Sequence, residues 1–100
     1  MLVKIHKSHE GRIILAICDS ELIRKKFVEG DLQIDLTGEF YQGEEKSEDE
    51  IKIIIKDVNC INAVGEKSIE FLKNLKLVDE DKIMMVAGVP HAEVVIIRDE

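Results

Sequence analysis

Two apolar runs separated by a short polar turn open the chain and predict a β-hairpin. The first run, residues 2–7, is rich in β-branched side chains, and the second, residues 12–18, is apolar without interruption from Ile13 to Cys18. Because this second run shows no alternation with polar residues, it predicts a strand that is buried on both faces and central in its sheet. Residues 8–11 have the composition of the turn between the two strands.

A short helix and a regularly alternating strand are predicted after this hairpin. Asp19 or Ser20 can supply the N-cap of a helix that ends at Gly30, where glycine permits a left-handed stop. Residues 31–37 then alternate strictly between apolar and polar side chains, which is typical of a strand with one face in a core. The apolar residues that this alternation turns inward are Leu32, Ile34 and Leu36.

Two helices in close succession are predicted in the middle of the chain. Ser47 and Glu50 have the spacing of a capping box, and the apolar residues that follow recur at helical intervals as far as Val58. Residues 59–62 interrupt this pattern, and a second helix is expected to begin directly after them. We therefore expect a tight helical pair in this region.

The last part of the chain predicts a second hairpin. Its strands are residues 82–87 and 92–98, and the segment Gly88-Val89-Pro90-His91 forms the turn between them. The expected order of elements is therefore β-β-α-β-α-α-β-β. This order predicts a single α+β domain spanning residues 1–100, in which about three helices pack on a mixed sheet built from two hairpins and one further strand.

The composition is that of a soluble globular protein, with 45% apolar and 35% charged residues in a chain of 100. The apolar runs are far shorter than the roughly 20 residues that cross a bilayer, and Lys4, His6 and Lys7 interrupt the N-terminal one. We therefore expect a cytoplasmic protein with no membrane contact, in which Cys18 and Cys60 are free thiols. Abundant Ile, Lys and Glu beside few Asn and Gln are typical of proteins from thermophiles.

The formal charge of -7 is distributed unevenly along the chain. Residues 31–58 hold most of the acidic excess, whereas basic side chains outnumber acidic ones in residues 1–30. An acidic total disfavours broad contact with a phosphate backbone but leaves room for a local basic patch. Arg24, Lys25 and Lys26 are the candidate patch, and a solvated surface with no ligand is the alternative interpretation.

One segment resembles the helix-hairpin-helix motif of many DNA-binding and DNA-repair proteins. In that motif, a glycine-containing turn aims the free backbone amides of the second helix at a phosphate. Gly65 matches the second glycine of the turn, Ala63 replaces the first, and Lys67 is the nearby cation. Asn62, Gly65 and Lys67 are therefore candidate phosphate-binding residues. The alternative is structural, with Gly65 permitting the close approach of two helices and Asn62 capping the second one.

His91 is a second candidate because the fixed backbone angle of Pro90 presents it at a defined orientation. It could contact a base or a ligand, and Glu93, two residues later, projects to the same side of a strand. This pair is a minimal acid–base arrangement, and a half-exposed turn histidine is the alternative interpretation. The chain has no spacing typical of metal or nucleotide binding, so we expect no metal, no cofactor and no assigned catalytic residue.

The adjacent aromatics Phe40 and Tyr41 fall in an acidic, glycine-containing segment, residues 38–46, that predicts an exposed loop. Exposed aromatic side chains are typical of surfaces that bind a protein partner. Packing of both rings beneath the loop is the alternative interpretation.

Four segments together resemble one archaeal family, known as domain of unknown function 424. They are residues 1–8 (MLVKIHKS), 39–43 (EFYQG), 62–66 (NAVGE) and 88–92 (GVPHA). The resemblance spans nearly the whole chain in the same order and implies an archaeal cytoplasmic protein. It carries no activity, substrate or cofactor with it, and therefore no catalytic residue.

Three functional hypotheses follow from these residues. The leading one is a non-enzymatic module that binds nucleic acid, RNA or a ribonucleoprotein through the turn at Asn62, Gly65 and Lys67, assisted by His91 and the patch at residues 24–26. The second is a protein–protein adaptor that uses the loop with Phe40 and Tyr41. The third is a small enzyme built around His91 and Glu93.

Overall fold

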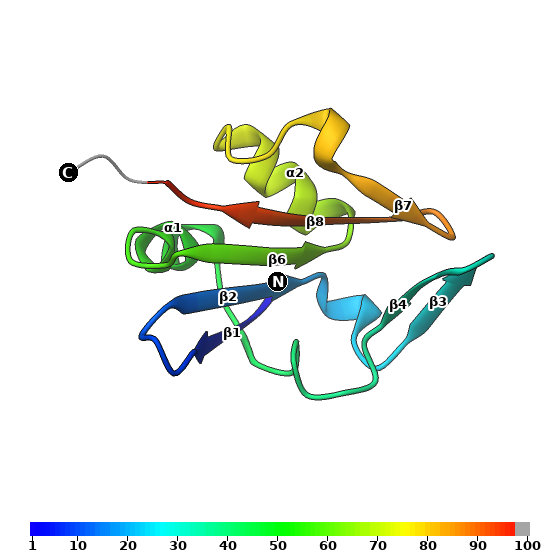
Figure 1. The fold of residues 1–100 in the computed structure, drawn as a ribbon, viewed down its shortest axis with the longest axis horizontal. Helices are drawn as coiled ribbons and strands as arrows, with labels where there is room; N and C mark the ends of the chain where they lie inside the picture. Colours follow the sequence, from blue (N-terminus) through cyan, green and yellow to red (C-terminus); the bar gives the residue numbers. More distant parts are fainter. Residues whose placement is uncertain (98–100) are drawn as a thin grey trace.

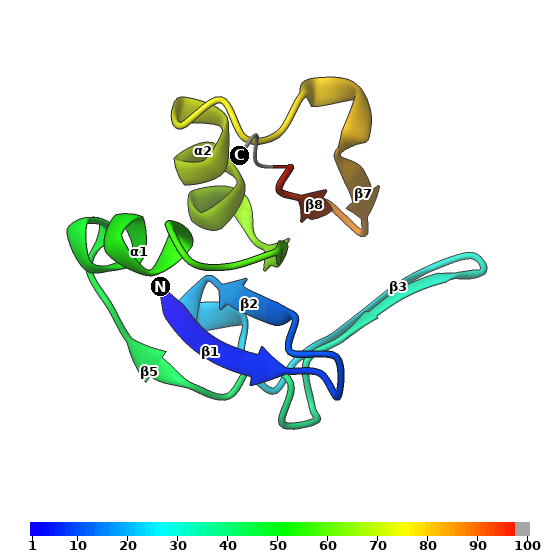
Figure 2. The same cartoon turned by 60° about the vertical axis from the view of Figure 1, so that its left-hand side comes forward.

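The sheet of the computed structural model, which describes residues 1–97, contains six strands in the order β5-β1-β2-β6-β8-β7. Figure 1 labels β1, β2, β6, β8 and β7, and Figure 2 labels β5. Neighbouring strands run antiparallel except β2 and β6, which pair in parallel. This mixed sheet with helices confirms the α+β prediction. The bounds of the strands are β1 Leu2–Lys7, β2 Ile13–Cys18, β5 Glu44–Glu45, β6 Cys60–Val64, β7 Met84–Val86 and β8 Val89–Val95.

Both predicted hairpins are present. β1 and β2 pair along their whole length, and β2 lies between β1 and β6 with its last four residues buried, as its uninterrupted apolar sequence predicts. In the second hairpin the turn falls at Ala87 and Gly88, which both have positive φ, and Pro90 and His91 therefore lie inside β8. The predicted end of that strand at Arg98 lies outside the described residues.

The helix predicted between Asp19 and Gly30 is wrong. A short 3₁₀ turn, η1 (Ser20–Leu22), is followed by β3 (Lys26–Glu29), which pairs antiparallel with β4 (Leu32–Asp35). Gly30 has a φ of +59° and makes the turn between these strands. A glycine in this conformation can either end a helix or form the turn of a hairpin. The sequence therefore indicated a change of direction at Gly30 correctly, but the segment before it is a strand and not a helix.

β3 and β4 form a two-stranded hairpin, which we call the arm, that projects away from the main sheet (Figure 2). Of the three apolar residues predicted to face a core from the 31–37 segment, Ile34 and Leu36 are buried, whereas Leu32 is 44% exposed. Leu32 lies close to the tip of the arm, where its register partner Glu29 accepts a hydrogen bond from the Ala87 amide of the β7–β8 turn.

The structure has two α-helices, α1 (Glu48–Ile55) and α2 (Glu66–Asn74), and a second 3₁₀ turn, η2 (Glu80–Lys82). The capping box predicted for the first helix is present, since Ser47 accepts from the Glu50 amide and Glu50 reaches back to the Ser47 amide. The predicted tight helical pair is wrong, because residues 60–64 form strand β6 between the two helices. The helix count is therefore two rather than three.

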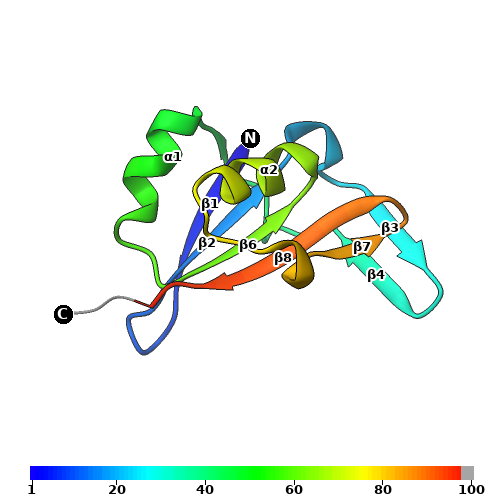
Figure 3. The same cartoon turned by 90° about the horizontal axis from the view of Figure 1, so that it is seen from above.

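Two apolar clusters hold these elements together. The first lies between the helices and one face of the sheet and includes Leu15, Ile17, Ile61 and Leu72, all fully buried. The second lies on the opposite face, where Cys18 and Val64 contact Ile34 and Leu36 from the arm and the residue after it. The arm extends beyond the β7 end of the sheet (Figure 3). The face that the helices leave uncovered is therefore only partly covered by other elements.

Candidate functional site

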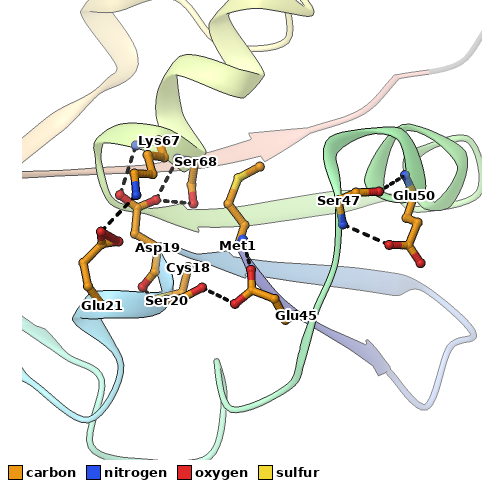
Figure 4. Close-up of polar contacts among 10 residues, drawn as sticks. All are labelled: Met1, Cys18, Asp19, Ser20, Glu21, Glu45, Ser47, Glu50, Lys67 and Ser68. Carbon is orange, nitrogen blue, oxygen red and sulfur yellow. Dashed lines mark hydrogen bonds and ion pairs between the residues drawn. The ribbon is translucent and has the colours of Figure 1, made fainter.

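The amides at the start of α2, predicted to bind phosphate, are already bonded within the protein. Asp19, directly after β2, is buried, and its carboxylate accepts hydrogen bonds from the backbone N–H groups of Lys67 (3.0 Å) and Ser68 (2.8 Å). The Ser68 hydroxyl donates a third bond to the same carboxylate at 2.7 Å (Figure 4). The position that an anion would take at this helix N-terminus is thus filled by a side chain from a neighbouring strand.

Gly65 allows this arrangement for two independent reasons, which are its backbone conformation and its lack of a side chain. It adopts a φ of +110°, which favours glycine, and it directly precedes α2. A Cβ at this position would lie 2.6 Å from Oδ1 of Asp19. The structural interpretation of Gly65 therefore holds in a modified form, because the glycine admits a carboxylate rather than a second helix.

The side chain of Lys67 also has a partner. Its ammonium group lies 3.1 Å from the carboxylate of Glu21, an exposed ion pair that raises the pKa of Lys67 and lowers the pKa of Glu21. Beside this pair, Glu45 bonds both the amino group of Met1 and the hydroxyl of Ser20 (Figure 4). Carboxylates thus surround the cation that the helix-hairpin-helix interpretation needed for phosphate.

Asn62, His91 and Glu93 come together on a different surface. Asn62 in β6 is the register partner of Glu93 in β8, and Val64 is the partner of His91, so these side chains share the sheet face opposite the helices. We call the accessible part of this face the open face. Its half-buried or exposed residues are Lys4, His6, Ile14, Cys60, Asn62, His91, Glu93 and Val95.

The loop with Phe40 and Tyr41 borders the open face, and its two rings have different environments. The Phe40 ring stacks on the imidazole of His6, with centroids 4.3 Å apart and planes inclined by only 7°, and it remains 41% exposed. His6 Nε2 also lies 2.9 Å from the Phe40 carbonyl oxygen, and Lys4 donates to the carbonyl of Glu39. The Tyr41 ring packs edge-on to Phe40 and against the second apolar cluster. Only Phe40 is therefore available to a partner.

The titratable groups of this region are poorly suited to nucleophilic chemistry. Burial raises the pKa of Tyr41 and raises the pKa of Cys18 to about 12, and burial together with Glu93 raises the pKa of Cys60. Partial burial lowers the pKa of His91, against the opposing effect of Glu93. Burial thus favours the neutral form of His91, which can donate and accept hydrogen bonds.

The basic residues Arg24, Lys25 and Lys26 belong to the arm and not to a helix. The Arg24 amide donates to the Leu36 carbonyl and the Leu36 amide to the Lys25 carbonyl, which continues the ladder of β3 and β4. All three side chains are exposed. They lie on the chain that leads into the arm, whereas Asn62 and His91 lie on the main sheet.

Sequence reasoning missed two residues that define these sites, Asp19 and His6. Asp19 or Ser20 was expected to cap the segment that follows, and Asp19 does precede η1, but its side chain bonds the amides at the start of α2 instead. The available signal was an acidic residue directly after a buried strand, a position where a side chain can meet a helix N-terminus. His6 had no signal, because its partner Phe40 is distant in the sequence.

Within residues 1–97, no group of three His, Cys, Asp or Glu side chains is arranged to hold a metal ion. The same residues contain no helix of the length and apolar character needed to span a membrane.

Three comparisons place the chain among known proteins. A family model described as "Protein of unknown function (DUF424)" matches residues 6–97. No curated protein gives a significant match. Among solved structures, the crystal structure of an uncharacterized conserved protein from Methanopyrus kandleri is similar, with a TM-score of 0.78 and 27% identity, covering 99% of this chain and 93% of that one. The predicted family resemblance is thus confirmed.

Proposed function

The chain belongs to the DUF424 family of proteins of unknown function, and we propose that it is a non-enzymatic module that binds single-stranded RNA on the open face of its sheet. The observation that carries this proposal is the His6–Phe40 stack, a flat and accessible pair of rings at the border of that face. Single-stranded RNA is recognised by stacking its unpaired bases on such rings, often on a sheet surface. Because Phe40 remains 41% exposed beside its stack with His6, we assign to it the ring on which a base stacks.

Cations next to the stack supply the contacts that phosphates need. Lys4, Lys7 and Arg12 come from the β1–β2 hairpin, in which Glu10 is the acidic residue, so this corner is basic although the chain as a whole carries -7. Phosphate contacts give affinity without sequence preference. We assign them to this hairpin rather than to Lys67, whose charge Glu21 neutralises.

Asn62 and His91 have the chemistry to read the edges of bases. The Asn62 amide offers both a donor and an acceptor, and the neutral His91 ring offers one of each. Both are half-buried on neighbouring strands of the open face, and His91 lies two residues before Glu93, the register partner of Asn62. We therefore retain Asn62 and His91 as proposed contacts to RNA, but not the predicted helix-hairpin-helix turn.

The test is the affinity for a fluorescently labelled single-stranded RNA pool, measured by anisotropy at fixed low salt. Phe40→Ala should weaken binding about tenfold to a hundredfold, the usual effect of losing one stacking ring. Phe40→Tyr keeps a ring and should bind as the wild type does, while Lys67→Glu serves as a control away from the open face. Equal affinities of wild type and Phe40→Ala, or no binding by either, would refute the proposal.

A protein–protein adaptor is the second candidate, and the arm is the observation that favours it. Val28 and Leu32 on the arm are 55% and 44% exposed, and Met84 on the neighbouring strand β7 is 50% exposed. Exposed apolar side chains on a projecting hairpin are typical of a docking element. Capture from a native cell extract with and without nuclease separates the candidates, since a protein held by the arm survives nuclease and is lost with Val28→Glu.

A further inference from the structure

Strand β1 has a free edge where its short neighbour ends. β5 pairs only with Leu2 and Val3, whereas β1 continues to Lys7. The Met1 carbonyl accepts a hydrogen bond from the Lys46 amide on the β5 side, and the Ser8 amide donates one to the Arg12 carbonyl on the β2 side. Because backbone groups alternate in direction along an antiparallel strand, the odd-numbered residues of β1 direct their N–H and C=O groups away from β2. The N–H and C=O groups of Ile5 and Lys7 therefore point away from the sheet with no strand opposite them in residues 1–97.

Long unprotected edges are unusual, because they pair readily with other chains. Natural edge strands are often shielded by a charge that points inward or by a bulge, but the outward-pointing backbone here belongs to Ile5, which is 54% exposed. The free part of the edge therefore presents the exposed apolar side chain of Ile5 next to the basic Lys7, and its open backbone groups can pair with an extended peptide.

A groove of about 550 Å³ runs beside this edge on the helix side of the sheet. Val3 and Ile5 from β1 and Ile54 from α1 form its apolar walls, and Gln42 and Glu44 come from the loop and β5. A strand added to β1 would direct every second side chain to the same side as Ile5. One such side chain would enter the groove next to Ile54.

The charges at the groove are basic in an acidic protein. Lys4 and Lys46 line it, and Lys7 follows at the end of the free edge. Glu44 is the acidic residue among the lining side chains, and its carboxylate is already 3.2 Å from the ammonium of Lys46. Glu50 lies 3.9 Å from the same ammonium, so within residues 1–97 the cations of this edge without a carboxylate at ion-pair distance are Lys4 and Lys7, which favours acidic side chains in the occupant.

We propose that the free edge of β1 binds an extended segment of another protein in which apolar and acidic residues alternate, added as a strand next to β1. The apolar side chains occupy the groove beside Ile5 and Ile54, and the acidic ones lie on the other side of the added strand, next to Lys4. The groove lies on the side of the sheet opposite the open face, and the two proposed surfaces share Lys4 and Lys7.

The test uses a short fluorescent peptide in which Val and Glu alternate, titrated with the full chain. A peptide in which Val and Lys alternate should bind at least about tenfold more weakly, as expected for reversed charge complementarity. Methylation of every second backbone nitrogen removes the main-chain donors without altering the side chains, and should also weaken binding about tenfold or more. On binding, the amides of Ile5 and Lys7 should become protected from hydrogen exchange.

Substitutions in β1 locate the site. Ile5→Pro removes the outward-pointing N–H together with the Ile5 side chain in the groove wall, so it should abolish peptide binding, whereas Ile5→Val keeps the N–H and a β-branched side chain and should bind as the wild type does. Phe40→Ala should leave peptide affinity unchanged, which separates this proposal from the RNA proposal. Equal binding of the Glu and Lys peptides, no binding at all, or a dimer of the chain that Ile5→Pro dissolves would each overturn the proposal, the last by assigning the edge to a second copy.

Discussion

The carboxylate of Asp19 occupies the space that a side chain on Gly65 would need. Asp19 directly follows strand β2, and Gly65 directly follows its parallel neighbour β6, immediately before α2. The pair therefore connects the centre of the sheet to the start of the second helix through the buried bonds to Lys67 and Ser68. The arrangement stabilises the fold at the place where sequence reasoning expected a ligand.

Gly65→Ala should strongly destabilise the protein. The substitution forces a Cβ against the Asp19 carboxylate and places an L-residue at a φ of +110°, so we expect the free energy of unfolding to fall by about 2–4 kcal/mol. Urea denaturation measures this change. Gly38→Ala is the matched control, since a Cβ there meets nothing within 4 Å, and its effect should stay within about 0.5 kcal/mol. Similar losses at both positions would contradict the role of the close approach.

Asp19→Ala should cost more stability than removal of the cap of the other helix. It leaves the Lys67 and Ser68 amides and the Ser68 hydroxyl without their acceptor in a buried site, which we expect to lower the free energy of unfolding by about 2–3 kcal/mol. Ser47→Ala removes an exposed cap from α1, and water can replace the lost bond, so about 1 kcal/mol is expected. Chemical denaturation of both variants gives the order, and the reverse order would contradict the buried cap.

The elements predicted correctly were those whose sequence pattern depends only on residues close together in the chain. The β2 run, the Ser47 capping box and the two terminal hairpins are local signals, and each appears in the structure. The prediction for residues 60–64 was wrong because a short apolar run is equally consistent with a junction between helices and with a buried strand. Only pairing with the distant β2 decides the matter, and that partner cannot be read from the local sequence.

The sequence identified residues of the candidate site but not which of them lie together in the structure. Asn62, His91 and Phe40 were each singled out from the sequence, and the structure places the first two on the open face and the third at its border. Gly65 and Lys67 were grouped with Asn62 through the resemblance to a helix-hairpin-helix turn, although the end of β6 and the turn into α2 direct them elsewhere. The Asp19 bonds, made across 48 and 49 positions of the chain, determine what the helix N-terminus can bind.

The two thiols should differ sharply in reactivity. Cys18 is fully buried with its pKa raised to about 12, whereas Cys60 is partly accessible, so a thiol reagent at about pH 8 should modify Cys60 alone in the folded chain. Glu93→Gln removes a charge that raises the pKa of Cys60 and should accelerate its modification. Mass spectrometry of the labelled chain identifies the site. Cys60→Ser should abolish labelling under native conditions, and rapid labelling of Cys18 would contradict the packing of the second cluster.

Protonation of His91 should destabilise the fold in mild acid. Burial lowers the pKa of His91 below its ordinary value of 6.5, so below about pH 6.5 the unfolded chain binds more protons than the folded one. The stabilising contribution is therefore complete above pH 6.5 and is lost as the pH falls through the lowered pKa. His91→Gln, which cannot titrate, should lose less stability than the wild type between about pH 7.5 and pH 5, as measured by urea denaturation at each pH.

Glu93→Gln gives the matched test of this pH dependence, because Glu93 is the group that opposes the effect of burial on His91. Without that carboxylate the pKa of His91 should fall further, so the loss of stability in acid should continue to lower pH than in the wild type. The chemical shifts of the His91 ring, followed by NMR during an acid titration, report the pKa directly. A His91 pKa above 6.5 in the wild type, or one that rises in Glu93→Gln, would contradict the burial and the pairing on which the proposed base-reading role of the open face depends.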